Sequence, residues 1–349
     1  MKTGSGDSNF RRAAFSCARA RGAARPGVAN GALRPAATTP SAVFVLFGIL
    51  FLMMLQPALG RQQKAQERPA YDMVVNAITL SVTVQGRGGR YVNDLEEKDF
   101  IVYENNEKKK ITYFAHDRNA PLSLTVLLDV SGSMALDNKF EECRTALHYL
   151  VRQLLSPRDE AALLVFADGD VEVAARHSTD RRAFIEALDK EKAYGMTALN
   201  DAVAVSPEFA TRAKNEKRAL LLITDGIEND SAVGPDEALE IARRVDVPIY
   251  VVGYKIPRSE TALAAHKRSA SLTTAGIVET LSRFAEATGG RAFFTDEPVG
   301  LLDAVKEIQK EQSHQYIIGY TSYREDDRYR RIRVMVPGRN YRIRTRQGY

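Results

Sequence analysis

The sequence has no tryptophan and only two cysteines, Cys17 and Cys143, among its 349 residues. Cys17 lies in a segment that we expect to be removed, so no internal disulfide is predicted in the mature chain. Cys143 falls on the apolar face of a predicted helix, where a thiol is usually buried and unreactive. A composition of 44% apolar and 27% charged residues argues against disordered, collagenous and polytopic membrane proteins.

The chain also lacks a basic surplus outside its first 60 residues. Those residues hold seven Lys or Arg and one acid, Asp7, which leaves 42 basic and 43 acidic residues over 61–349. Binding to nucleic-acid phosphates requires an excess of positive charge on the folded part of a protein. The composition therefore argues against a nucleic-acid partner.

The first 60 residues form a basic leader typical of an export signal. An uncharged apolar run over 42–55 is followed by the small residues Ala58 and Gly60, as signal peptidase requires. The run is shorter than the roughly 20 residues that cross a bilayer. We therefore expect cleavage before Arg61 and a periplasmic or extracellular location. The alternative is an uncleaved inner-membrane anchor over 42–59, which would be the chain's contact with a membrane.

Residues 61–70 are a polar linker, and two segments that flank the rest of the chain share one pattern. Residues 71–118 and 322–349 contain runs in which apolar and polar residues alternate, as in strands with one solvated face. Neither segment has enough apolar positions to bury a core alone. We predict that the two segments together form a small module that resembles a β-sandwich.

Residues 119–321 alternate continuous apolar runs with helical periods. Continuous apolar runs are typical of parallel strands that are covered on both faces. The alternation predicts an α/β fold with a doubly wound, mostly parallel sheet of the Rossmann-like type. Pro207 is expected to break the helix that follows Thr197. Strands are predicted over 124–130, 161–166, 219–223 and 249–252, and helices over 140–154, 184–188, 238–245, 277–285 and 301–308.

A carboxylate and two hydroxyls follow the first of these strands, in the segment Asp129-Val130-Ser131-Gly132-Ser133. Ligands of open α/β sheets bind outside the carboxyl ends of the strands, so the position suits a binding site. Hard oxygen donors favour a small hard cation such as Mg²⁺. Gly132 is expected to let the backbone turn so that the two hydroxyls converge. Further oxygens come from Thr197 and Asp225, at the ends of later segments.

Asp129, Ser131, Ser133, Thr197 and Asp225 match, in order, the residues of the metal-ion-dependent adhesion site. Through these five residues the chain resembles the von Willebrand factor A domains. The resemblance implies that Ser131, Ser133 and Thr197 contact Mg²⁺ directly, with Mn²⁺ or Ca²⁺ as alternative ions. Asp129 and Asp225 would act mostly through water. The sixth coordination position would accept an Asp or Glu carboxylate of a partner protein. We expect the side chains of Ser133 and Asp225 at the rim of the sheet, outside its core.

The flanking segments carry a narrower resemblance. Residues 93–105 read NDLEEKDFIVYEN, residues 315–320 read QYIIGY, and residues 344–349 read RTRQGY. These segments resemble the exported bacterial family named for a VWFA-related acidobacterial domain. The resemblance covers about residues 71–349 and implies an architecture more than an activity.

Three further features are interpreted as ordinary structural elements. Asp168-Gly169-Asp170 lies between two strands and is predicted to be a hairpin turn. The arginines over 324–349 are interpreted as a solvated strand face of long side chains. Residues 257–273, rich in Ser and Ala, are predicted to be a long loop without an assigned role.

Three sequence motifs of common enzyme classes are missing from the sequence. Its five histidines form no HExxH motif, and neither GxSxG nor GxxxxGK occurs. No histidine is placed by the sequence as a base for Ser131. We therefore predict an exported, Mg²⁺-dependent protein-binding module of the adhesion type, without catalytic residues. The alternatives are a structural or assembly protein of the cell envelope, whose site docks intramolecularly, and a metal-dependent hydrolase.

Overall fold

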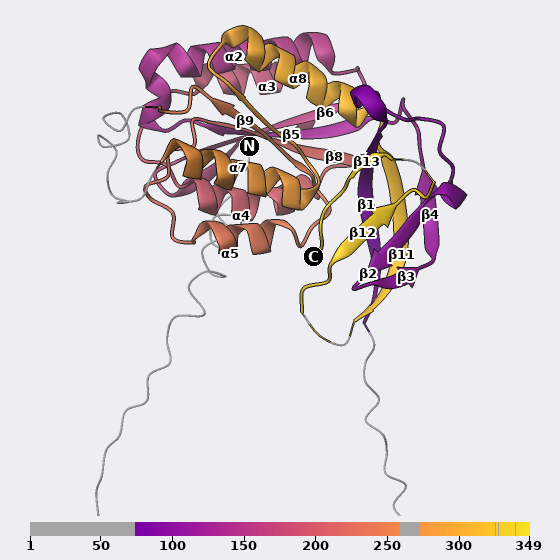
Figure 1. Ribbon diagram of the computed structural model, residues 1–349. Coiled ribbons are helices and arrows are strands. Elements are labelled where there is room, and N and C mark those ends of the chain that lie inside the picture. Colours follow the sequence, from indigo (N-terminus) through magenta and orange to yellow (C-terminus); the bar gives the residue numbers. More distant parts are fainter. Residues whose placement is uncertain (1–73, 259–272, 325, 327, 339) are drawn as a thin grey trace, which may run out of the picture.

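The computed structural model describes residues 74–258 and 273–349, except 325, 327 and 339. The predicted leader over 1–60, the linker over 61–70 and most of the loop over 257–273 lie outside the described residues. Figure 1 shows two parts side by side. One is a sheet with helices on both faces, and the other is a smaller all-β part built from both ends of the described chain.

A six-stranded sheet forms the centre of the larger part, in the order β10-β9-β8-β5-β6-β7. Its strands run parallel except β7, which pairs antiparallel with β6. Every residue of β5 and β6 is buried, as expected where helices cover both faces. The strands are β5 (Leu122–Asp129), β6 (Glu160–Ala167), β7 (Asp170–Ser178), β8 (Lys217–Thr224), β9 (Ile249–Tyr254) and β10 (Ala292–Thr295).

Helices cover the two faces of this sheet in two groups. One apolar cluster contains side chains of α2, α3 and α8, and a second contains side chains of α4, α5 and α7. The predicted doubly wound α/β fold is thus confirmed. Among the described helices, none is both long and apolar enough to span a membrane. The helices are α2 (Lys139–Tyr149), α3 (Arg181–Lys190), α4 (Leu199–Ala210), α5 (Pro235–Ala242), α7 (Thr274–Thr288) and α8 (Pro298–Gln312).

Pro207 does not break α4, contrary to the expectation from the sequence. It lies inside the last turn of the helix, and Thr211 N–H still donates to Pro207 O at 3.2 Å. A proline removes its own N–H donor and crowds the carbonyl of the preceding turn, but the hydrogen bond from Thr211 shows that the turn after it still forms. The hydroxyl of the preceding Ser206 donates to Ala202 O at 2.6 Å. The helix therefore continues past the proline to Ala210.

The smaller part consists of two antiparallel sheets, ordered β13-β1-β11-β4 and β12-β2-β3. Apolar side chains from both sheets fill one core, in which Leu80, Val102 and Ile318 are fully buried. β11 pairs along its whole length with β1, so it crosses the boundary expected at 321. The strands are β1 (Val74–Gln85), β2 (Ile101–Glu104), β3 (Glu107–Lys109), β4 (Ile111–Ala115), β11 (Tyr316–Arg324), β12 (Ile332–Met335) and β13 (Arg342–Arg344).

Two arginines near the carboxyl end are not solvated, contrary to their interpretation from the sequence. Arg344 Nη2 lies 2.5 Å from Glu311 Oε2 on α8. Arg346 is 4% exposed and donates from Nη2 to Thr79 O at 2.9 Å. These side chains are covered because the all-β part packs against the α/β part at this point. Arg342, in the same strand as Arg344, is exposed as expected.

Candidate metal site

The five predicted site residues lie at the carboxyl edge of the parallel strands. Asp129 is the last residue of β5, and Asp225 directly follows β8. Ser131 and Ser133 lie in the turn after β5, and Thr197 precedes α4. Because β5 and β8 are neighbours in the sheet, their ends bring the two carboxylates close enough for the charge of one to raise the pKa of the other.

The two serine hydroxyls converge. Ser131 Oγ lies 3.1 Å from Ser133 Oγ, and Asp129 Oδ1 accepts a hydrogen bond from Ser131 N–H at 2.9 Å, which fixes the start of the turn. Neighbouring ligands of an octahedral Mg²⁺ with bonds of about 2.1 Å lie about 3 Å apart. The spacing of the hydroxyls therefore suits two adjacent coordination positions.

Gly132 has a different role from the one expected. Its backbone is not in the left-handed region, so the turn itself does not require glycine. A Cβ at this position would lie 3.1 Å from Gly195 O, the atom to which Gly132 N–H donates at 2.9 Å. Gly132 thus allows the loop after β5 to approach the loop that carries Thr197.

Gly195 and Asp168 hold the Thr197 loop in place. The turn Asp168-Gly169-Asp170 joins β6 to β7, which confirms the predicted hairpin. Asp168 Oδ1 accepts a hydrogen bond from Met196 N–H at 2.6 Å. Gly195 has φ +74°, and a Cβ there would lie 2.3 Å from the same oxygen. Only glycine combines this conformation with this contact.

The loop after β8 also contacts Thr197. Asn229 Oδ1 accepts a hydrogen bond from Thr197 N–H at 2.7 Å. In return, Thr197 O accepts hydrogen bonds from the N–H groups of Asn229 and Asp230 at 3.1 and 3.0 Å. The loop after β8 and the loop before α4 are therefore fixed to each other at the site.

The carboxylates are buried, contrary to the expectation that Asp225 and Ser133 lie outside the core. Asp129 and Asp225 are 0% exposed, and Ser133 is 5% exposed. Burial is tolerated because the oxygens have partners. Thr224 Oγ1 donates to Asp129 Oδ2 at 2.6 Å, and Lys139 Nζ lies 2.8 Å from Asp225 Oδ2.

The electrostatics of the site favour an added cation. Burial, followed by the negative charge of Asp225, raises the pKa of Asp129 to about 7. Two carboxylates face one ammonium, that of Lys139, so a negative charge is left without a counter-charge. An unpaired buried charge is costly, and a divalent ion would compensate it. The donor set and its charge thus fit Mg²⁺.

An ion at this site would depend on hydroxyl ligands. Within residues 74–258 and 273–349, no group of three or more His, Cys, Asp or Glu side chains could hold a metal ion. The candidate site has only two carboxylates. Its remaining oxygens come from Ser131, Ser133 and Thr197, which are neutral donors.

The histidines in the described part of the chain bind groups other than the serines of the site. His148 Nε2 lies 2.7 Å from Asp189 Oδ1, and His177 Nε2 lies 2.9 Å from Thr125 Oγ1. His116 contacts Gln315 O, just before β11, and His314 contacts Lys310 O in α8. His266 lies outside the described residues.

Four residues that shape the site were not assigned to it from the sequence: Lys139, Asp168, Thr224 and Asn229. Lys139 had a detectable signal, because it is a charged residue next to Phe140 at the start of the apolar helical period. Thr224 is adjacent to Asp225 in the same motif. The contacts of Asp168 and Asn229 to the Thr197 loop span 28 and 32 residues, so local sequence carries no sign of them.

Comparisons with known proteins match the part of the chain that holds this site. A family model of the von Willebrand factor type A domain matches residues 123–311. An uncharacterized protein of Borreliella burgdorferi is 24% identical over 218 residues, which cover 59% of this chain and 62% of that protein. The chain thus spans about three fifths of the length of this curated relative.

Solved structures show a weaker likeness. The conserved hypothetical protein BatB of Bacteroides thetaiotaomicron has a TM-score of 0.44 and 20% identity, covering 55% of this chain and 98% of its own. The von Willebrand factor domain of the type V pili tip protein Mfa5 of Porphyromonas gingivalis has a TM-score of 0.42 and 10% identity, covering 55% and 94%. Values this low carry no conclusion about function.

Proposed function

Since the chain belongs to the von Willebrand factor type A domain family, we propose that it is a protein-binding module. It would hold Mg²⁺ and bind an Asp or Glu carboxylate of a partner protein. The observation that carries the proposal is the pair of hydroxyls 3.1 Å apart beside two buried carboxylates with one ammonium. The residues that would hold the ion are Asp129, Ser131, Ser133, Thr197 and Asp225.

The hydrogen bonds of the site support different roles for its hydroxyls and carboxylates. Asp129 already accepts from Ser131 N–H and Thr224 Oγ1. Asp225 accepts from Ile227 N–H at 3.2 Å and pairs with Lys139. The serine hydroxyls have donors and lone pairs to spare, so they are the natural direct ligands. A bound Mg²⁺ would supply a positive charge with an exchangeable coordination position.

The first experiment measures whether the site binds Mg²⁺. Isothermal titration calorimetry of the purified protein with MgCl₂ is expected to show one site. Ser133→Ala is expected to abolish binding, because it removes one direct ligand and little volume. Ser206→Ala is the matched control, since that buried hydroxyl donates only to Ala202 O in its own helix. Equal Mg²⁺ affinity in the two variants would contradict the assignment of the site.

The second experiment tests the partner. Immobilised protein is incubated with envelope extract in Mg²⁺ and then eluted with EDTA. A partner that elutes from the native protein and is absent with Ser133→Ala supports carboxylate binding in trans. Mg²⁺ binding without any EDTA-eluted partner favours intramolecular docking in a structural protein. Mg²⁺-dependent turnover of ester, phosphate or peptide substrates, lost in Ser133→Ala, would favour the hydrolase.

We also propose that the protein is exported and non-catalytic. Export is supported by the basic leader, the apolar run over 42–55 and the small residues before Arg61, and the non-catalytic role by the lack of HExxH, GxSxG and GxxxxGK motifs. The resemblance of the flanking segments to the exported VWFA-related acidobacterial family agrees with this. Mass spectrometry of the protein from its native host is expected to find a chain that begins at Arg61. An intact segment over 42–59 in the membrane fraction would establish the anchor instead.

A further inference from the structure

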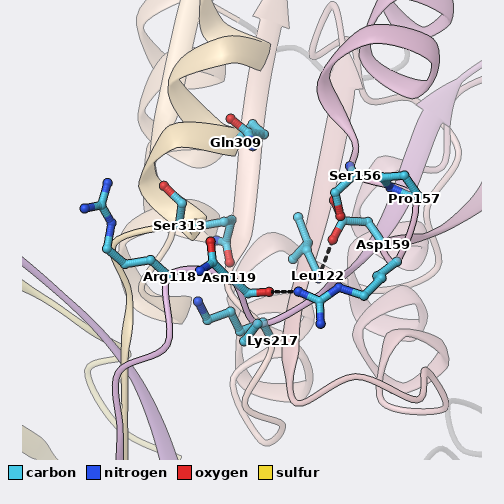
Figure 2. Close-up of a pocket in the computed structure, with 12 residues that line it drawn as sticks. Arg118, Asn119, Leu122, Ser156, Pro157, Asp159, Lys217, Gln309 and Ser313 are labelled. Carbon is cyan, nitrogen blue, oxygen red and sulfur yellow. Dashed lines mark hydrogen bonds between the residues drawn. The ribbon is translucent and has the colours of Figure 1, made fainter.

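A cavity of about 810 Å³ lies at the amino ends of the parallel strands, opposite the edge that carries the candidate metal site. Figure 2 shows its walls. They come from the connection between β4 and β5, the turn before β6, the first residue of β8 and the end of α8. The volume lies in the range of sites that hold small organic molecules.

The walls of this cavity carry more positive than negative charge. Three cationic side chains line it, those of Arg118, Arg158 and Lys217, together with one carboxylate, that of Asp159. Arg158 donates from Nη2 to Asn119 O at 2.5 Å. Among the described residues, none of the three cations forms an ion pair at this cavity.

Backbone N–H groups donate hydrogen bonds to both oxygens of the one carboxylate in the wall. Asp159 Oδ1 accepts a hydrogen bond from Leu122 N–H at 2.8 Å, and its Oδ2 accepts one from Ser156 N–H at 2.6 Å. Asp159 is 7% exposed. Both of its oxygens therefore already accept hydrogen bonds from the wall, although the charge of Asp159 still acts on Lys217.

Lys217 is a buried cation with unused hydrogen-bonding capacity. It is 3% exposed, and its Nζ donates to Asp117 O. An ammonium has three donors, so two N–H groups are left for another acceptor. Burial lowers the pKa of this amine, although the negative charges of Asp117 and Asp159 act in the opposite direction.

Gln312 lines the same cavity and carries a buried acceptor. Its Nε2 lies 2.8 Å from Tyr250 Oη, and Tyr250 Oη donates its one proton to Glu311 Oε1 at 2.8 Å. The phenol must therefore accept from the amide nitrogen, which fixes the orientation of the amide. Gln312 Oε1 is buried and has no hydrogen-bond partner in the described part of the chain. Buried acceptors of this kind are usually satisfied.

We propose that this cavity binds a small organic anion that carries an oxyanion group, carboxylate or phosphate, and a hydroxyl group. Lys217 and Arg158 bind the oxyanion, and Gln312 Oε1 accepts a hydrogen bond from the hydroxyl. The volume exceeds the size of an inorganic anion, which favours an organic ligand. This site shares no residue with the candidate metal site and does not depend on it.

The test is isothermal titration calorimetry of the purified protein in EDTA with four probes at equal ionic strength. L-malate and glycerol 3-phosphate present the two oxyanions with a hydroxyl, succinate lacks the hydroxyl, and NaCl is the ionic control. Malate or glycerol 3-phosphate is expected to bind, and the better of the two shows which oxyanion is preferred. Succinate is expected to bind about tenfold more weakly than malate, because Gln312 Oε1 then stays unpaired.

Variants identify the cavity as the place of binding. Lys217→Met and Arg158→Gln are each expected to weaken binding about tenfold or more, as for the loss of one charge-assisted hydrogen bond. Arg152→Gln is the matched control, because this exposed arginine does not line the cavity. Arg158 is exposed too, so its variant tests binding without disturbing the core.

Three results would overturn the proposal. The first is that neither malate nor glycerol 3-phosphate gives heat beyond that of NaCl. The second is that Arg152→Gln weakens binding as much as Arg158→Gln does. The third is that succinate binds as tightly as malate, which would remove the role of the hydroxyl and of Gln312.

Discussion

Lys139 Nζ lies 2.8 Å from Asp225 Oδ2, and the two side chains are 6% and 0% exposed. They are 86 residues apart in the sequence. Lys139 is the first residue of α2, and Asp225 directly follows β8. The pair thus ties the helix to the sheet at the candidate metal site, and it leaves Asp129 as the carboxylate without a cationic partner.

Replacing either partner of this pair is expected to be strongly destabilising. Lys139→Met and Asp225→Asn should each lower the free energy of unfolding in EDTA by about 3–5 kcal/mol, because each strands a buried charge. The double variant should lose less than the sum of the two. Urea denaturation measures all three. Lys306→Met is the control, since its pair with Asp303 is exposed and should change stability by less than about 1 kcal/mol.

The close contact between Gly195 and Asp168 in the Thr197 loop can be tested by substitution. Gly195→Ala is expected to weaken Mg²⁺ binding and to lower the free energy of unfolding by about 1–3 kcal/mol, because its Cβ would displace Asp168. Gly88→Ala separates this contact from backbone strain, since Gly88 has φ +80° and open space around its Cβ position. Equal destabilisation in the two variants would show that the contact with Asp168 has no effect.

Glu104 is expected to make the protein sensitive to acid. Burial alone would raise its pKa, but hydrogen bonds from Tyr349, Ser322 and Lys109 and the charge of Lys109 together lower it below 4.5. A lowered pKa in the folded state stabilises the fold above the unfolded value and loses this effect as the pH falls through the folded value. Stability should therefore decrease below about pH 4.5.

Urea denaturation between pH 3 and pH 7 checks this prediction. Glu104→Gln should show a shallower loss of stability at low pH than the native protein. Glu107→Gln is the control, because Glu107 pairs with the same Lys109 but is exposed. If the two variants have the same pH profile, Glu104 does not determine the acid response.

The contact between Arg344 and Glu311 is expected to hold the two parts of the protein together. Glu311 is 0% exposed and also accepts from Tyr250 Oη at 2.8 Å. Arg344→Met should therefore cost about 3–5 kcal/mol of unfolding free energy, because it leaves a buried carboxylate without its cation. Arg342→Met, in the same strand but exposed, should change stability by less than about 0.5 kcal/mol. Urea denaturation compares them, and similar losses would contradict an interface role.

A fragment of residues 71–118 is expected to be unfolded by itself. In the full protein, β1 lies between β11 and β13, and β2 pairs with β12, so the fragment would lose most of its strand partners. Its amide proton spectrum should lack dispersion. A dispersed spectrum would mean that the segment before the α/β part has a core of its own.

Local patterns in the sequence were sufficient for most elements of the fold. Continuous apolar runs identified β5, β6, β8 and β9. A strand that is covered on both faces carries apolar residues at successive positions, so its sequence does not alternate with polar residues. The short strand β10 was missed, and the helix α4 was wrongly expected to be broken at Pro207. β10 is four residues long and partly exposed, and in α4 the proline outweighed an apolar helical pattern that burial stabilises.

The sequence by itself indicated most of the strands and helices and the five oxygen-bearing residues of the candidate site, because periodicity and motif spacing are properties of neighbouring residues. Only the tertiary structure decided which charged side chains are buried and which side chains they pair with. Lys139 with Asp225, and Arg344 with Glu311, are pairs from distant segments, and so is the contact of Gly132 with Gly195. The stability of a charge depends on its solvent exposure and its partners, and both are fixed only when the sheet and helices pack.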